Sequence, residues 1–289
     1  MPGKTPCAWT WGAVRTALAL ACLVSAGSVR AADAEVETVG LALTGEQAEV
    51  FLRTAEIIAR EDIPEGVTRP QRLTLSDGER TLRASWKTID EHKPGLWRGE
   101  NGSYQFDFRD SWKHEVAAYE LDKLLGLGMV PPTVERRIDG RRGALQLWVE
   151  GVMTGKARRE GKIEPKGPRH IIRWQHQIHC VRLFHQLTHN TDLGNLENIL
   201  VSPDFQVWVI DASRAFRIQR ELIAPDDLKC FSRAALERLE ALDEAVIEET
   251  MGDLLSDLQV EGLLARRDRI LTLVKVRLVE KGPGQVLFQ

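Results

Sequence analysis

Two aspartates flank a short apolar hairpin pattern in the second half of the chain. Asp192 lies in a polar loop, and Asp211 directly follows the second of two apolar runs, 199–201 and 207–210, which are joined by a turn at 202–204. Such a hairpin brings both carboxylates to one cleft. Phosphoryl transfer from a nucleotide needs this pair, because one carboxylate accepts the proton of the attacking hydroxyl and the other holds Mg²⁺ on the phosphates.

The same chemistry needs a cation on the α- and β-phosphates, a group that orients this cation, and a second metal ligand. Lys87 ends an alternating apolar run, and Glu115 lies in the first turn of a helical segment, from which it could pair with Lys87. Glu197 and Asn198 offer oxygen atoms of the hard type that Mg²⁺ prefers. The chain order is Lys, Glu, Asp, Asn, Asp, as in protein-kinase-like folds.

Each of these residues also has an ordinary structural explanation. A lysine at the end of a strand is usually solvated, and a glutamate in the first turn of a helix is favoured by the helix dipole. Asp192 and Asp211 could cap a loop or form an Asx-turn. Only the combination, in this order and on these elements, favours phosphoryl transfer.

The elements that would position these residues follow an export signal. Residues 1–31 have the pattern typical of a signal peptide, with basic Lys4 and Arg15, an apolar run at 17–26 and small residues at 29–34. The run is too short to cross a bilayer, and no later segment of the 289 residues is apolar enough. We therefore expect an exported protein, periplasmic or secreted. Its formal net charge of −3 gives no reason to expect nucleic acid as a partner.

The first half of the remaining chain alternates strands with one strong helix. The patterns predict a helix over 46–59, a loop over 94–102 and a helix over 112–125 capped by Asp110 or Ser111. Two hairpins, each turning at Asp-Gly, are predicted: one pairs 72–75 with 81–87, and the other pairs 133–138 with 144–149.

The second half is mostly helical around the hairpin that carries the aspartates. A basic loop over 151–168 precedes a helix over 171–188, and helical periodicity returns from 225 onward. The predicted fold class is α+β with two lobes, a small strand-rich N-lobe with one key helix over 35–150 and a larger helical C-lobe over 151–289.

Two blocks of sequence resemble a known group of enzymes. Residues 115–126, E-V-A-A-Y-E-L-D-K-L-L-G, and 130–134, V-P-P-T-V, resemble the E-[IV]-A-A-[FY]-x-L-D-[RK]-[LI]-L…V-P-P-T-V block of secretory-pathway kinases of the Golgi casein-kinase type. Residues 190–192 and 210–216, I-D-A-S-R-A-F, resemble the N-x-D-R loop and the [LI]-D-x-[GS]-R-x-F motif of that family. These kinases are similar to phosphatidylinositol-kinase-related bacterial proteins, and the resemblance covers about residues 73–216.

The resemblance implies a kinase-like fold that binds ATP with Mg²⁺ or Mn²⁺. Lys87 would contact the nucleotide phosphates, Glu115 would orient Lys87, Asp192 would be the base and Asp211 a metal ligand. The second ligand stays open. The family places it five residues after the base, which is Glu197 here, whereas Asn198 is six residues on.

A second departure leaves two functions open. Leu193 follows Asp192 where the family usually has Arg. The protein is therefore either an ATP-dependent phosphotransferase acting on a hydroxyl of a protein, sugar, lipid headgroup or metabolite, or a catalytically inactive kinase-fold module that binds nucleotide or protein in the cell envelope.

A competing site is a group of histidines on one helical segment. His185 and His189 are one turn apart, a spacing that can bind Zn²⁺, but Gln186 stands where a metalloprotease has glutamate. The group comprises His170, His176, His179, His185 and His189. Cys180 and Cys230 could form a disulfide or remain free.

Two further groups have both a functional and a structural interpretation. The pairs Arg136-Arg137, Arg141-Arg142 and Arg158-Arg159 could bind an acidic substrate or belong to a solvated surface. Trp148, at the end of the second hairpin, could line an adenine pocket or belong to the core.

Overall fold

A five-stranded antiparallel sheet carries the lysine of the candidate site. The computed structural model describes residues 39–63, 70–99, 102, 104–192 and 194–289, so the predicted signal peptide lies outside it. The strand order is β1-β2-β3-β7-β6. The strands are β1 (Glu56–Asp62), β2 (Gln71–Ser76), β3 (Thr81–Lys87), β6 (Thr133–Ile138) and β7 (Arg141–Leu147).

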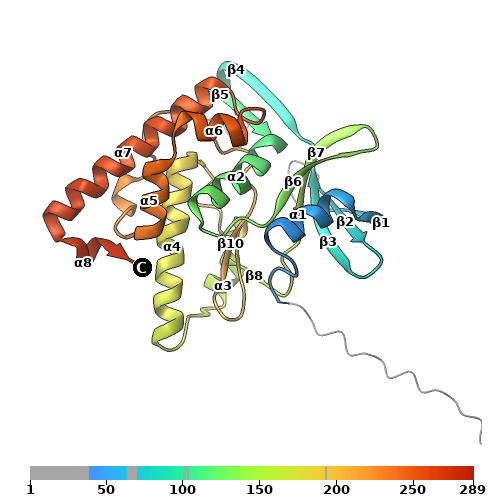
Figure 1. Ribbon diagram of the computed structural model, residues 1–289, viewed down its shortest axis with the longest axis horizontal. Coiled ribbons are helices and arrows are strands. Elements are labelled where there is room, and N and C mark those ends of the chain that lie inside the picture. Colours follow the sequence, from blue (N-terminus) through green and yellow to red (C-terminus); the bar gives the residue numbers. More distant parts are fainter. Residues whose placement is uncertain (1–38, 64–69, 100–101, 103, 193) are drawn as a thin grey trace, which may run out of the picture. The chain divides into compact units, whose positions relative to one another are not determined.

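One face of this sheet is apolar because alternate residues of each strand point to the same side. Leu73, Leu75, Ala84 and Trp86 are buried there and pack with the apolar side of helix α1 (Gly45–Thr54), which covers the sheet (Figure 1). The two predicted Asp-Gly hairpins are confirmed, since β2 pairs with β3 and β6 pairs with β7.

Two sequence predictions in this half are wrong. The helix predicted over 46–59 ends at Thr54, and its second half is β1, where β-branched Ile57 and Ile58 favour pairing with β2. The loop predicted over 94–102 belongs largely to β4 (Asp90–Arg98), which pairs with β5 (Tyr104–Ser111). The register shifts between Lys93 and Leu96, and this bulge accommodates Pro94-Gly95 within a strand.

Helix α2 (Trp112–Leu125) begins and ends as predicted. Ser111 is the N-cap and accepts the Lys113 N–H at 3.3 Å, while Gly126 ends the helix with a φ of 64°. The helix lies between the sheet and the helices at the end of the chain (Figure 1). It contacts β6, β7, α5 (Arg233–Ala241) and α6 (Glu244–Met251). It therefore connects the two halves of the molecule at the point where Glu115 is placed.

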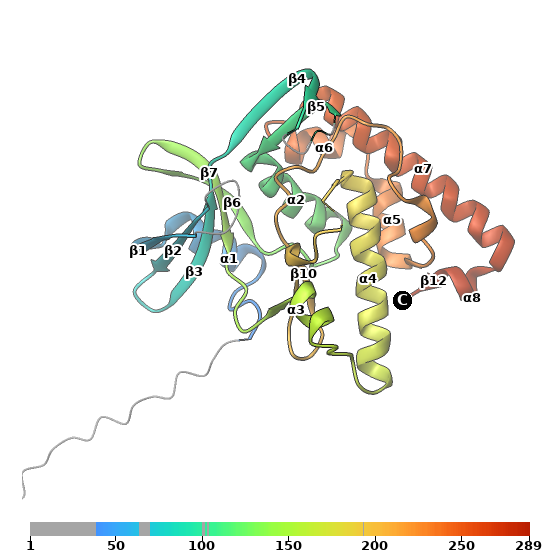
Figure 2. The same ribbon diagram turned by 180° about the vertical axis from the view of Figure 1, so that it is seen from behind.

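The larger part is helical, as predicted. Its main core gathers buried residues of α2, α4 and the later helices. α4 lies beside α7 in both views (Figures 1 and 2). The helices are α3 (Gly155–Glu160), α4 (Pro168–Thr188), α5 (Arg233–Ala241), α6 (Glu244–Met251), α7 (Asp257–Lys281) and α8 (Pro283–Val286).

A small three-stranded sheet contains the hairpin that lies between Asp192 and Asp211 in the chain. β9 (Ile199–Val201) pairs with β10 (Val207–Val209) on one side and β8 (Met153–Thr154) on the other, and a short parallel pair joins β11 (Phe231–Ser232) to β12 (Leu287–Phe288). Among the described helices, none is both long and apolar enough to cross a membrane. The boundary between lobes at 150/151 stays a prediction.

Candidate active site

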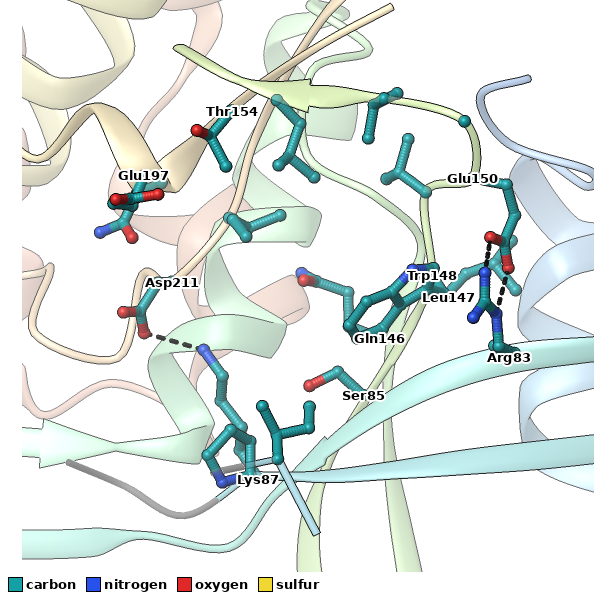
Figure 3. Close-up of a pocket in the computed structure, with 18 of the residues that line it drawn as sticks. Arg83, Ser85, Lys87, Gln146, Leu147, Trp148, Glu150, Thr154, Glu197 and Asp211 are labelled. Atoms are coloured by element: carbon teal, nitrogen blue, oxygen red, sulfur yellow. Dashed lines mark hydrogen bonds and ion pairs between the residues drawn. The ribbon is translucent and has the colours of Figure 1, made fainter. Parts of the chain in front are cut away.

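Two carboxylates from separate elements meet at one lysine. Lys87 Nζ, at the end of β3, lies 2.6 Å from Glu115 Oε1 on α2. It also lies 2.8 Å from Asp211 Oδ1 after β10 (Figure 3). The other oxygen of Glu115, Oε2, accepts the Ala212 N–H at 3.1 Å. One buried carboxylate thus holds both the lysine and the backbone beside Asp211.

Burial and charge set the protonation of this cluster. Burial acts to lower the pKa of Lys87, but Glu115 and Asp211 outweigh it and raise that pKa, so the amine stays protonated. Burial raises the pKa of Glu115, which is 2% exposed, against the opposing effect of Lys87. Asp211 is 41% exposed, and for it the nearby Lys87 ammonium outweighs burial and lowers the pKa. Asp211 is therefore the ionised partner that remains accessible.

A cavity of about 950 Å³ opens beside this cluster (Figure 3). Lys87 and Ser85 line it from β3, Trp148 from the segment after β7, and Asp211 from the opposite side. The other lining residues are Ile63, Pro70, Arg83, Gln146, Leu147, Val149, Glu150, Gly151, Val152, Thr154, Asn195, Glu197, Asn198, Leu200 and Ile210. The cavity is large enough for a small-molecule ligand such as a nucleotide.

Trp148 lies in this cavity, as one of its two interpretations requires. The Arg72 guanidinium lies 4.5 Å from the centre of its indole. Arg83 lies on the same side of the cavity and donates from Nε to Glu150 Oε1 at 2.7 Å (Figure 3). Part of the cavity wall is thus an aromatic ring next to an ion pair.

Asp192 is held by asparagine side chains of its own loop. Its Oδ2 accepts from Asn198 Nδ2 at 3.1 Å and from Asn195 Nδ2 at 3.4 Å, and its backbone N–H donates to Asn190 Oδ1 at 3.0 Å. Asn198 and Asn195 line the cavity, whereas Asp192 does not. The candidate base therefore lies just beyond the cavity, on the side of Asn198.

Glu197 also lines the cavity, but its carboxylate is paired outward. Its Oε1 lies 2.9 Å from Lys156 Nζ of α3, and both side chains are about half exposed. The structure brings Lys87, Glu115, Asp211 and Asn198 to one place beside the cavity, and puts Asp192 next to Asn198. Glu197 is thus ion-paired with a residue that does not line the cavity.

The segment after Asp211 is fixed to α2 by a buried network. Asp211 has a φ of 61°, and Ser213 O accepts from the Ser111 N–H at 2.9 Å and from His114 Nδ1 at 2.7 Å. Gln259 Nε2 of α7 lies 2.8 Å from His114 Nε2. Burial lowers the pKa of His114 to about 4, so the ring is neutral and bonded on both nitrogens.

The sequence did not predict the pairing of Asp110 with Arg214. Asp110 was considered as a cap of α2, yet Ser111 is the cap, and the buried Asp110 Oδ2 accepts from Arg214 Nε at 2.7 Å. Arg214 is the arginine of the I-D-A-S-R-A-F motif, so the motif named the residue but not its partner.

The competing groups do not form sites in the described part of the chain. No three His, Cys, Asp or Glu side chains among the described residues are placed to hold one metal ion. Cys180 and Cys230 are free thiols, which decides between the two alternatives. Arg136 donates to the carbonyls of Leu52 and Ala55 at 2.9 and 2.7 Å, a structural use that favours the surface interpretation for this arginine.

The sheet, the helix that carries Glu115 and the helical part with its aspartate hairpin define an atypical kinase-like fold. Among solved structures, the chain is similar to that of hydra Fam20 with sugar, at 15% identity and a TM-score of 0.60, over 85% of this chain and 93% of that one. A second match is the Helicobacter pylori proinflammatory kinase CtkA, at 10% identity and a TM-score of 0.45, over 79% and 97%. The predicted two-lobed kinase-like fold is confirmed by the first of these. No protein-family model and no curated protein matches the sequence.

Proposed function

We propose that the protein is a kinase-type phosphotransferase that uses ATP with Mg²⁺ or Mn²⁺ to phosphorylate a hydroxyl group. The observation that carries this proposal is the position of Lys87, which is bound to Glu115 and Asp211 at the edge of a cavity of nucleotide size. Maintenance of the fold does not require a lysine between two carboxylates there. Binding of phosphates by Lys87, with Glu115 holding the ammonium in place, does require it.

The residues beside Lys87 fit a divalent cation. Asp211 is ionised and partly exposed, and Asn198 offers an amide oxygen on the same side of the cavity. Mg²⁺ is typically held by one or two protein oxygen ligands together with substrate phosphates. Such an ion, when bound, neutralises charge on the β- and γ-phosphates.

Asn198 is the better second ligand in our assignment. Its Nδ2 donates to Asp192, and its Oδ1, which accepts from Asn195 Nδ2 at 3.4 Å, is turned away from that carboxylate. Glu197 would have to leave Lys156, and its side chain is directed toward α3. The six-residue spacing therefore fits a loop with one extra residue relative to the family pattern.

Asp192 is the proposed base. Its Oδ2 accepts from two asparagine amides of the same loop, and these hydrogen bonds orient the carboxylate. It lies beyond the cavity, where an acceptor hydroxyl would approach the γ-phosphate. Trp148, which lines the cavity, would contact the adenine.

The proposal specifies the acceptor only as a hydroxyl group. A protein side chain, a sugar, a lipid headgroup and a small metabolite all fit, and sugars are worth early testing because the similar Fam20 structure was solved with sugar. Export remains part of the proposal, and it requires that ATP reach the protein in its compartment or that the protein act before export.

The first test is thermal stabilisation of the chain without residues 1–31 by ATP with Mg²⁺ or Mn²⁺. We expect the melting temperature to rise by about 5 °C at a ligand concentration of 100 Kd, because binding to the folded state stabilises it by about 2.7 kcal/mol. Asp211→Ala removes the proposed metal ligand and should abolish the metal-dependent part of this rise.

The matched control is Asp226→Ala, which removes an exposed carboxylate that does not line the cavity. It should leave the stabilisation at the wild-type value. An equal rise in the Asp211 variant would refute the metal assignment. If no nucleotide stabilises the wild type, the alternative of a kinase-fold protein-binding module replaces the proposal.

A further inference from the structure

Arg214 is fixed in place beside the candidate catalytic residues. The two residues before it are bound to α2, since the Ala212 N–H donates to Glu115 and Ser213 O accepts from Ser111 and His114. Its own Nε donates to Asp110 Oδ2 at 2.7 Å, and Asp110 is 3% exposed. The guanidinium is therefore oriented by a rigid, buried partner.

The rest of the guanidinium is available for a ligand. Within the described residues, neither Nη atom of Arg214 has a hydrogen-bond partner, and the side chain is 40% exposed. Phe108 lies beside it, with its ring centre 5.7 Å from Cζ. An arginine held along its Nε edge presents its two Nη donors as a fork, which is the geometry that binds the oxygens of a phosphoryl group.

Arg214 follows Asp211 by three positions and is not part of the cavity lining to which Asp211 belongs. Half-burial acts to lower the pKa of Arg214, but Asp110, then Asp211 and Asp192, raise it. Arg214 is therefore an anchored cation next to the segment that carries Asp211.

The sequence lacks one cation of the family pattern. The kinases that the chain resembles carry an arginine directly after the base, and here that position is Leu193, whereas the arginine of the second motif is kept as Arg214. Lys87 is bound to two carboxylates. Arg214 is thus an anchored cation close in sequence to Asp211, and its Nη atoms are available for a ligand.

We propose that Arg214 binds the phosphoryl group during its transfer. This inference rests on the proposed function. As the bond from the γ-phosphorus to the bridging oxygen breaks, the electron pair leaves with ADP, and a new bond forms to the acceptor oxygen. The acceptor proton goes to Asp192. The Nη donors of Arg214 offset the negative charge on the non-bridging oxygens of the group in transit.

The experiment compares Arg214→Gln and Arg214→Lys with the wild type. The control is Arg220→Gln, which removes an exposed arginine of the same segment that pairs with Glu261. Three quantities are measured: stabilisation by ATP with Mg²⁺, the extra stabilisation by ADP with Mg²⁺ and aluminium fluoride over ADP with Mg²⁺ alone, and phosphate release from ATP with water as acceptor. Aluminium fluoride mimics the phosphoryl group in transit.

We expect Arg214→Gln to keep the stabilisation by ATP, to lose the extra stabilisation by aluminium fluoride and to release phosphate about 100-fold more slowly. Arg214→Lys should recover part of both losses, because it restores the charge without the fork. Arg220→Gln should match the wild type in all three. A merely structural role of Arg214 would instead weaken ATP binding and the aluminium fluoride effect together.

Three results would overturn the inference. One is an Arg214→Gln variant that behaves as the wild type, and another is one that loses ATP binding in parallel. The third is a wild type that ATP with metal stabilises but that shows no extra stabilisation by aluminium fluoride. That result would leave the proposed nucleotide binding intact. A wild type that binds no nucleotide refutes the proposed function, and the role of Arg214 falls with it.

Discussion

The cleft around Lys87 and the histidine-rich helix α4 show opposite relations between sequence and space. Lys87 and Asp211 are 124 positions apart in the chain, yet their side chains lie 2.8 Å apart. Five of the seven histidines fall within residues 170–189, yet no metal-type cluster of three or more forms from the described residues. Nearness in sequence was the weaker guide, because a site forms where separate elements converge.

The side chains of the two regions also have different kinds of neighbours. In the cleft, charges are paired across elements and border a cavity. Two histidines of α4, His176 and His179, share Phe288 as an aromatic neighbour. His185 is 4% exposed in the core, and the His176 ring stacks on Phe288 with centres 4.0 Å apart. The first arrangement can bind a charged ligand, whereas the second contributes to packing.

The largest effect that would test this difference between the two regions is expected from Asp192→Asn in the cleft. The variant keeps the size of the side chain and removes its ability to accept a proton. Phosphate release from ATP should fall by about 10²- to 10⁴-fold, the contribution typical of a general base. Stabilisation by ATP with Mg²⁺ should stay at the wild-type value, because the base is not needed to hold the nucleotide.

Asp204→Asn, in the turn of the same hairpin, is the control for this variant. Asp204 pairs with Arg173 and does not line the cavity, so both quantities should be unchanged. Unchanged phosphate release in Asp192→Asn would show that Asp192 is not the base and only accepts hydrogen bonds from the asparagines of its loop. The cleft would then resemble α4, with polar residues that serve the structure.

The fold and most of the candidate site could be predicted from local pattern. Asp-Gly turns identified both hairpins, and Ser111 and Gly126 delimited α2, because caps and turns depend on a few adjacent residues. The pairing of Lys87 with Glu115 was also predicted. β4 was missed, because Pro94-Gly95 is typical of a loop and only its pairing with β5 makes it a strand.

Long-range polar partners could not be predicted. Asp110 and Arg214 are 104 positions apart, and His114 and Gln259 are 145 apart. Nothing in the local sequence distinguishes a capping aspartate from one that pairs with a distant arginine. The choice between Asn198 and Glu197 also depended on partners, namely Asp192 and Lys156, which only the folded chain brings close.

A smaller effect is expected from His185→Leu on α4. Burial lowers the pKa of His185 from 6.5 to about 4, so the folded state excludes a proton that the unfolded state binds below pH 6.5. The contribution of this group to stability is present above pH 6.5 and is lost as the pH falls toward 4. Between pH 7.5 and 5.0 the wild type should lose about 2 kcal/mol more unfolding free energy than the variant.

Urea denaturation at the two pH values measures this difference. His170→Leu removes an exposed histidine of the same helix, and its loss of stability between the two values should equal that of the wild type. If His185→Leu loses as much stability as the wild type on acidification, the imidazole takes up a proton freely in the folded state. The helix would then offer an accessible histidine after all.

The smallest effect is expected when Zn²⁺ is added to the wild type. A zinc site needs three or four ligands that converge, and binding to such a site stabilises the folded state. His185 is buried and His176 is stacked on Phe288, so one equivalent of Zn²⁺ should change the melting temperature by less than about 1 °C. Thermal denaturation with Zn²⁺ and with a chelator tests this expectation. A rise of several degrees that His185→Leu abolishes would show that the helix assembles a site, and the contrast with the cleft would fail.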